Sequence, residues 1–128
     1  MGAAPTLQAQ AAVPNGSSGT PAAAAAGVCP YFHEAVELLG KRWTGVIVLS
    51  LLGGPMRFSA ITHAIPQISD RLLSIRLKEL EACEIVTRKV SEDAPIRVEY
   101  ELTSKGRALE PTVTSLRAWA CDWLRDQA

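Results

Sequence analysis

GGPMRFSAITHAIPQISDRLLSIRLKELEACEIVTRKVSEDAPIRVEYELT, residues 53–103, is the stretch that decides the fold of this 128-residue chain. Its hydrophobic periodicity predicts a short helix, a turn at Pro66 and a longer helix over residues 69–83. The alternating, β-branched segments 85–90 and 98–102 then predict a two-stranded hairpin. Helix, turn, helix and hairpin in this order predict an α+β, mainly helical domain with a winged helix-turn-helix.

The longer helix is amphipathic, and its polar face carries groups suited to DNA. Its apolar stripe is Leu73, Leu77 and Leu80, which should pack against a core. The opposite face carries Arg71, Ser74, Ile75 and Lys78, and Ser69 and Asp70 stand at the N-terminus. Such side chains contact phosphates, base edges and thymine methyl groups. We therefore predict a recognition helix with Ser69 as its N-cap. A solvated face without a partner is the alternative for an amphipathic helix of this kind.

Further cations flank this helix. Arg57 precedes the short helix, and Arg88, Lys89 and Arg97 lie in the predicted wing. Each is a candidate for DNA contact, and an ion pair within the domain is its alternative. Arg76 borders the buried stripe, so an internal ion pair and a phosphate contact are both open. Lys41 and Arg42, before the central helix, are candidate phosphate contacts.

The overall charge is zero, whereas DNA-binding domains are usually basic. Residues 57–78 nevertheless carry a net charge of +3, and the acidic residues gather after residue 78. A locally positive face on a neutral protein predicts a modest non-specific electrostatic contribution to DNA affinity. The rival hypothesis is a winged-helix module for protein interaction or ligand sensing that binds DNA weakly.

Helices are also expected on both sides of this core. Residues 30–39 should form a first helix that Gly40 ends, and residues 43–52 a buried central helix. After residue 103 a last helix is expected, which Pro111 must interrupt or restart. Its apolar seam is Leu109, Val113, Leu116, Ala120 and Trp123. Such a narrow seam is typical of contacts between helices.

Residues 1–28 contain no charged or aromatic side chain, which predicts a disordered tail before a single domain over residues 29–126. The tail lacks the features of a signal peptide, and no apolar run predicts a membrane span. The three cysteines, Cys29, Cys83 and Cys121, form no disulfide framework. A cytoplasmic protein is expected, with Cys83 partly exposed and Cys121 packed.

Cys29 is the candidate chemical switch. It lies just before a predicted helix N-terminus, where the helix dipole and free amides favour the thiolate. A packed, inert thiol is the alternative. Cys29, His33 and Glu37 share one helix face, but three groups on one helix without a convergent partner are weak support for a metal. No cofactor and no enzyme activity are expected, because the sequence shows neither a nucleophile with its base nor a phosphate loop.

Residues 29–124 resemble the HxlR family of bacterial winged-helix transcription regulators. The resemblance rests on motifs in a fixed order: CP at 29–30, LGKRWT at 39–44, GPMRFS at 54–59, ISDRLL at 68–73, RLKELE at 76–81 and PIRVEYELT at 95–103, with Gly106 beyond. It differs at two positions. Glu84 stands where the family usually has Gly, and Ile96 replaces the second of two prolines in the wing.

The resemblance implies a homodimer built from the N- and C-terminal helices, with Phe32 on the first and the seam on the second. Two recognition helices would occupy successive major grooves of an inverted-repeat operator, more often for repression than for activation. It also implies that Arg97 reaches the minor groove. In several relatives a cysteine at the place of Cys29 senses oxidants or electrophiles, so an oxidant or a small molecule is the expected inducer.

Overall fold

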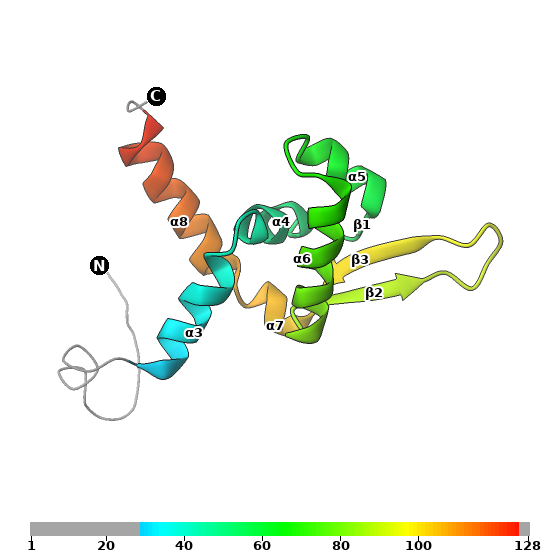
Figure 1. Cartoon of the computed structure of the whole chain (residues 1–128), viewed down its shortest axis with the longest axis horizontal. Coiled ribbons are helices and arrows are strands. Elements are labelled where there is room, and N and C mark those ends of the chain that lie inside the picture. The colour runs from blue at the N-terminus through cyan, green and yellow to red at the C-terminus, as the bar shows by residue number, and fades with distance from the viewer. Residues whose placement is uncertain (1–28, 126–128) are drawn as a thin grey trace. The chain divides into compact units, whose positions relative to one another are not determined.

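The computed structural model describes residues 29–125 (Figure 1). The predictions for residues 1–28 and for residue 126 lie outside this range. The chain divides between Leu38 and Leu39 into two units, which are described separately.

The first unit contains helix α3 (Pro30–Leu39) except for its last residue, and this helix has the bounds that the sequence predicted. Its first turn is closed by the backbone amide of His33, which donates to the carbonyl of Cys29 at 3.0 Å. None of its side chains is buried, although Tyr31, Phe32 and Val36 are large and apolar. Isolated helices of this length are marginally stable in water, so α3 needs a further packing partner for its apolar side chains.

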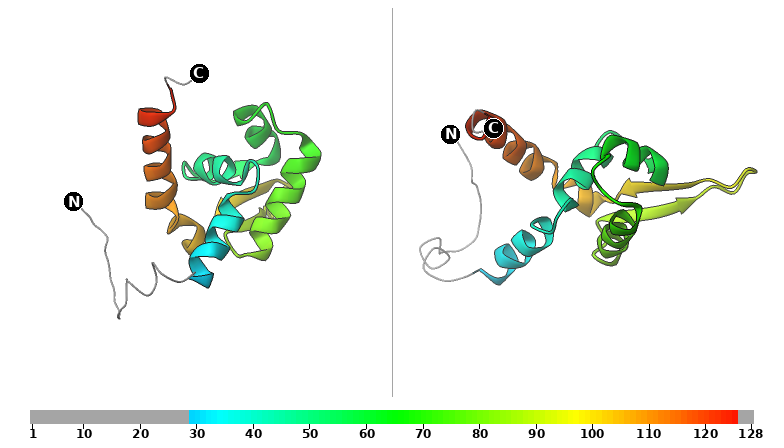
Figure 2. Two further views of the ribbon diagram at one scale, coloured as in Figure 1. Left: turned by 60° about the vertical axis from the view of Figure 1, so that its left-hand side comes forward. Right: turned by 45° about the horizontal axis from the view of Figure 1, so that its top comes forward.

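The second unit is the predicted winged helix-turn-helix. Its elements are α4 (Thr44–Leu51), β1 (Met56–Arg57), α5 (Phe58–Ala64), α6 (Asp70–Ala82), β2 (Val86–Val90), β3 (Val98–Leu102), α7 (Ser104–Arg107) and α8 (Glu110–Trp123). The three strands form an antiparallel sheet in the order β1-β3-β2, and β2 and β3 project from the helices as the wing (Figure 2). The predicted α+β class is confirmed.

The core of this unit lies between α4, α5, α6 and the base of the sheet. Its fully buried members are Ile47, Val48, Leu51, Ile61, Leu73, Leu77, Leu80 and Val86. The apolar stripe predicted for α6 is therefore buried as expected. Helix α4 is shorter than predicted, because Trp43 lies before its first residue with φ 76°. It is also less buried than predicted, because Val46 is exposed.

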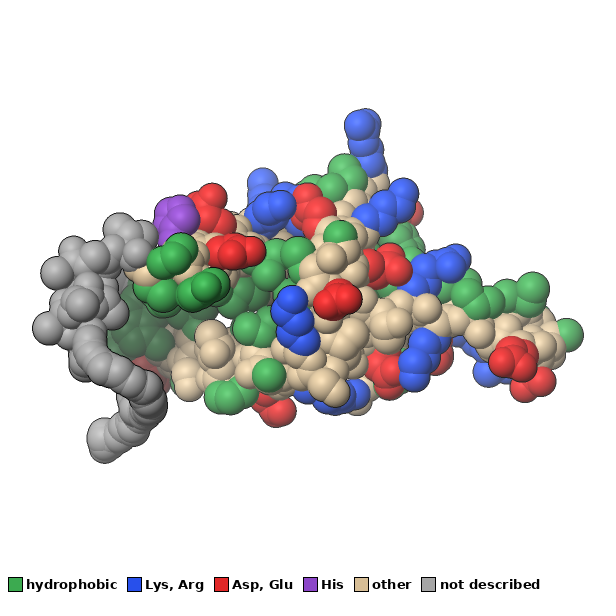
Figure 3. Space-filling view, turned by 90° about the horizontal axis from the view of Figure 1, so that it is seen from below, with side chains coloured by type: hydrophobic (Ala, Val, Ile, Leu, Met, Phe, Trp, Pro, Cys, Tyr) green, Lys and Arg blue, Asp and Glu red, His purple; other side chains and the backbone are tan. Residues whose placement is uncertain are grey.

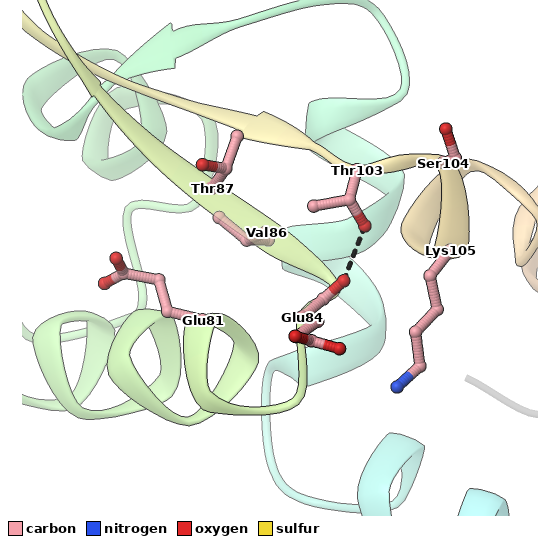
Figure 4. Close-up of a pocket in the computed structure, with 7 residues that line it drawn as sticks. All are labelled: Glu81, Glu84, Val86, Thr87, Thr103, Ser104 and Lys105. Carbon is pink, nitrogen blue, oxygen red and sulfur yellow. Dashed lines mark hydrogen bonds between the residues drawn. The ribbon is translucent and has the colours of Figure 1, made fainter.

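The connection from α6 to β2 contains Glu84 at φ 61°, the left-handed conformation that a glycine adopts more easily. A non-glycine residue there costs about 1–2 kcal/mol. The hydroxyl of Thr103 donates to the carbonyl of Glu84 at 2.6 Å and accepts from the amide of Gly106 at 3.1 Å (Figure 4). A Cβ at Gly106 would lie 2.3 Å from the carbonyl oxygen of Ile85, so only glycine fits there. These contacts hold the wing to α7.

The C-terminal helix is divided as Pro111 predicted, into α7 and α8. Val113, expected in a seam between helices of two molecules, is instead buried where α8 meets α4. Leu109 is half-buried and Ala120 is half-buried, whereas Leu116 and Trp123 are exposed. Cys121 is exposed rather than packed. The prediction of one continuous seam was wrong at Val113, because that side of α8 faces the core of its own chain.

Candidate nucleic-acid interface

Helix α6 begins at a built N-cap. Ser69 has extended backbone dihedrals, and its hydroxyl accepts a hydrogen bond from the amide of Leu72 at 3.1 Å. This satisfies one of the free amides at the helix start, as predicted. Asp70 follows in the first turn, where its charge complements the helix dipole.

The face of α6 opposite Leu73 and Leu77 is open to solvent. Arg71 and Lys78 are exposed, Ile75 is 41% exposed, and Ser74 is half-buried. Within the described residues, neither Arg71 nor Lys78 takes part in an ion pair. The helix therefore presents two unneutralised cations beside an apolar group and a hydroxyl, at spacings that share one face.

Arg76 belongs to the interior of the domain. Its Nη1 donates to Oε1 of Glu79 at 3.1 Å, and its Nε donates to the carbonyl of Arg42 at 2.8 Å. The open choice between an ion pair and a phosphate contact is therefore decided for the ion pair.

The two residues before the central helix are also engaged. Lys41 Nζ lies 3.4 Å from Oε2 of Glu79, and the guanidinium of Arg42 stacks over the ring of Trp43 at 5.2 Å. Neither cation is as available to phosphate as the sequence suggested. The spacing of Arg76 and Glu79 could have suggested their pair, but the link to Arg42 joins residues 34 apart and has no local signal.

In the wing, the pairing of β2 with β3 places Arg88 and Lys89 on opposite faces of the hairpin. Lys89 pairs with Glu101, and Arg88, one residue earlier, points to the other face of the hairpin. The hydrogen bond and the charge of Lys89 hold the pKa of Glu101 below its ordinary value. Lys89 is thus partly neutralised, as the alternative reading proposed. Arg57, Arg88 and Arg97 have no ion pair within residues 29–125.

The far end of the wing is acidic and apolar. Glu92 and Asp93 are exposed, and Ile96 is 74% exposed. The loop is closed at its base, where the amide of Ser91 donates to the carbonyl of Arg97 at 2.8 Å and the amide of Arg97 donates to the hydroxyl of Ser91 at 2.9 Å. Figure 3 shows acidic and apolar side chains at this end, and basic and acidic side chains interspersed along the same face. Carboxylates repel phosphate, so the base of the wing is better suited to DNA than its end.

Cys29 occupies the N-cap position of α3. Its thiol is half-buried, and the sulfur accepts a hydrogen bond from the amide of Phe32 at 3.4 Å. Cys83, at the C-cap of α6, is half-buried as predicted.

Other kinds of site have little support. In residues 29–125 no group of His, Cys, Asp or Glu side chains could hold a metal ion, and no helix is long and apolar enough to cross a membrane. A hollow of about 530 Å³ lies where α6 meets the wing. It is lined by Glu81, Glu84, Val86, Thr87, Thr103, Ser104 and Lys105 (Figure 4). Its lining carries charges of both signs, from Glu81, Glu84 and Lys105. The ammonium group of Lys105 already donates a hydrogen bond to the carbonyl of Cys83 at 2.8 Å.

Comparisons with known proteins agree with this geometry. The HxlR-like helix-turn-helix model matches residues 38–128. The HTH-type transcriptional regulator YvaP of Bacillus subtilis is 48% identical over 97 residues, which cover 76% of this chain and 90% of YvaP. The HTH-type transcriptional regulator YodB of the same organism is 50% identical over 93 residues, which cover 73% of this chain and 83% of YodB.

Solved structures give the same result. The reduced form of YodB matches with a TM-score of 0.71 and 46% identity, over 78% of this chain and 98% of that one. Its quinone-bound form matches with a TM-score of 0.65 and 47% identity, over 75% and 100%. The redox regulator HypR in its reduced form matches with a TM-score of 0.68 and 35% identity, over 72% and 91%.

Proposed function

The chain belongs to the HxlR-like helix-turn-helix family of transcription regulators, and we propose that it binds an inverted-repeat operator as a homodimer and represses the adjacent promoter. In this proposal α6 enters the major groove. Arg71 and Ser74 contact base edges, Ile75 contacts a thymine methyl group, and Lys78 contacts a phosphate. The observation that supports it best is the exposure of Arg71 and Lys78 on α6, neither of which forms an ion pair with another residue in the range 29–125.

The rest of the interface follows from exposure. Ser69 and Asp70 stand at the end of α6 that reaches the groove first, where Asp70 either accepts from a cytosine amino group or orients Arg71. Arg88 and Arg97 at the base of the wing and Arg57 on β1 are proposed backbone or minor-groove contacts. Lys89 ranks below them, because Glu101 already holds its ammonium group.

The dimer is proposed from unpartnered apolar side chains. On α8, Leu116, Trp119 and Trp123 are 60%, 51% and 68% exposed, and they recur at helical spacing. Soluble monomers rarely expose such a stripe. Trp119 was missing from the predicted seam, although its spacing from Leu116 was visible in the sequence. Phe32 on α3, which has no buried side chain, is proposed to contribute to the same dimer.

We also propose thiol control through Cys29. Its support is the sulfur at a helix N-cap, together with the related structures of the redox regulator HypR and of the transcriptional regulator YodB in its reduced form. Oxidation or modification of this thiol would change the sulfur that accepts the hydrogen bond from the amide of Phe32 at the start of α3. DNA affinity should then change on mild oxidation in the wild type and not in Cys29→Ser. An equal response in the two proteins would exclude this thiol as the switch.

The decisive experiment is a DNA titration at several salt concentrations. The logarithm of the affinity should fall linearly with the logarithm of salt concentration, with a slope of about −0.9 for each phosphate neutralised. Arg71→Ala should weaken operator binding by about 1–3 kcal/mol. Arg107→Ala, an exposed arginine on α7 outside the proposed interface, should leave it unchanged.

A second candidate function rests on the interspersed charges of the surface and the acidic wing end (Figure 3). These features favour a protein partner over DNA. A flat salt dependence and equal binding by wild type and Arg71→Ala would support that alternative.

A further inference from the structure

The turn between α3 and α4, residues 40–43, contains two unfavourable features. Trp43 has φ 76°, a backbone conformation that bulky residues rarely adopt. Next to it, the hydroxyl of Thr44 is buried and has no hydrogen-bond partner in the described part of the chain. Buried hydroxyl groups are nearly always bonded. Such features persist only where surrounding interactions hold the backbone in place.

Those interactions come from the recognition helix. Arg76 reaches out of α6 and donates from Nε to the carbonyl of Arg42, immediately before Trp43, at 2.8 Å. Its Nη1 bonds Glu79 at 3.1 Å, and the second oxygen of Glu79 lies 3.4 Å from Lys41 Nζ. We call these four residues the Arg76 clamp. Two links therefore tie the turn to α6, one to a carbonyl and one to a side chain.

Arginine is the residue that this geometry needs. Its side chain is only 17% exposed, so the hydrogen bonds are partly shielded from water. The planar guanidinium donates in two fixed directions at once, to Glu79 and to the carbonyl of Arg42. A lysine keeps the charge and can reach one acceptor, but it lacks this rigid fork. Exchange of the two residues is therefore not conservative here.

We propose that Arg76 is a positioning residue of the DNA interface, which sets the orientation of α6 through the Arg76 clamp. It contacts no DNA itself and acts on Arg71 and Lys78 through the helix that carries them. This inference rests on the proposed function, and it assigns to that site a residue that positions its helix.

The first test uses the full-length protein without DNA and measures amide hydrogen exchange in Arg76→Lys. The amide of Thr44 donates to the carbonyl of Lys41, and that of Ile47 donates to the carbonyl of Trp43. Both should exchange about tenfold faster in the variant, because the turn opens locally more often. The amide of Leu73, bonded to the carbonyl of Ser69, should not change. A general loss of stability would accelerate all three.

The second test measures affinity for operator and for random DNA. Arg76→Lys should bind the operator about tenfold more weakly and bind random DNA as the wild type does, with the same salt slope. The reason is that charge is kept while the orientation of α6 is lost. Arg107→Lys makes the same chemical change at an exposed position outside the clamp and should match the wild type in both tests.

Three results would overturn the proposal. Unchanged exchange at Thr44 and Ile47 would show that Arg76 does not hold the turn. Unchanged operator affinity would show that holding the turn does not position α6. For Arg76→Gln, a salt slope reduced by about 0.9 together with equal loss on both DNAs would make Arg76 a phosphate contact. If the wild type bound no DNA, the proposed function and the role in DNA binding would both fail, and the exchange test would still decide whether the clamp holds.

Discussion

Helices α6 and α8 are both amphipathic, but the apolar face of α6 is buried and most of that of α8 is exposed. In α6, Leu73, Leu77 and Leu80 are buried in the core of the chain. In α8 only Val113 is buried, and Leu116, Trp119 and Trp123 remain open to solvent. A helix whose apolar face is already covered presents its polar face to a partner, which suits DNA. A helix whose apolar face is uncovered needs a protein surface. The proposed division of labour between the two helices follows from this difference.

The largest expected effect is on the free energy of unfolding, compared between one leucine-to-alanine substitution in the apolar face of α6 and one in that of α8. Leu77→Ala should lower the free energy of unfolding by about 2–5 kcal/mol, because it leaves a cavity in the core. Leu116→Ala, measured in urea at a protein concentration low enough to favour monomers, should change it by less than about 0.5 kcal/mol. Similar losses in the two variants would mean that α8 is as well packed as α6.

A second test concerns the uncovered face alone. Trp119→Glu should raise the dimer dissociation constant at least about thirtyfold, the effect expected of a buried aromatic anchor at an interface. Sedimentation equilibrium measures it directly. Arg117→Glu introduces the same carboxylate on the opposite side of α8 and should leave the dimer intact. Dissociation by both variants, or by neither, would contradict an interface on this stripe.

A smaller effect is expected where α6 ends. Glu84→Gly should raise the free energy of unfolding by roughly 0.5–1 kcal/mol, because glycine adopts the left-handed conformation without strain. Glu84→Ala keeps the strain and should be close to neutral. Chemical denaturation of the three proteins distinguishes them, and a loss of stability in the glycine variant would assign the Glu84 carboxylate a structural role.

The smallest effect lies in the wing that follows α6. The folded-state pKa of Glu101 is lowered by Lys89, so their interaction stabilises the fold above the ordinary pKa of glutamate and is lost as the pH falls through the lower, folded value. In Lys89→Gln an NMR titration should show that the pKa of Glu101 has risen towards its ordinary value. Arg88→Gln alters the other face of the hairpin and should leave that pKa in place. A shift in both variants would mean that strand register does not separate these cations.

Much of the candidate site could be predicted from local pattern. The cap at Ser69, the apolar stripe of α6 and the break near Pro111 all depend on neighbours within a few residues, whereas the unusual residue Glu84 was noticed only through the family resemblance. The spacing of side chains along a helix also determined which residues share its free face. These features need no knowledge of what approaches from elsewhere in the chain.

The partner of each charged side chain could not be predicted from local pattern. The sequence placed Arg71 on the free face of one helix and Arg76 at the border of its buried stripe, but it gave no sign that Arg76 bonds the carbonyl of Arg42, 34 residues away. Lys89 and Glu101 meet only because β2 and β3 pair in a particular register. Val113 and Leu116 follow the same helical periodicity, so the sequence placed both in the dimer contact. Only the structure shows that Val113 is buried in its own chain and Leu116 is exposed.

The sequence by itself therefore determined the order of the main helices and of the two wing strands, their ends to within a residue or two, and the faces that each could present, because hydrophobic periodicity, capping and turn preferences act over a few residues. Only the tertiary structure decided which apolar faces are covered by the chain itself and which cations are neutralised. Those outcomes depend on contacts between residues far apart in sequence. Folding buries the apolar stripe of α6 in the core and brings Arg76 on the same helix to the turn before α4, a contact between residues 34 apart in the chain.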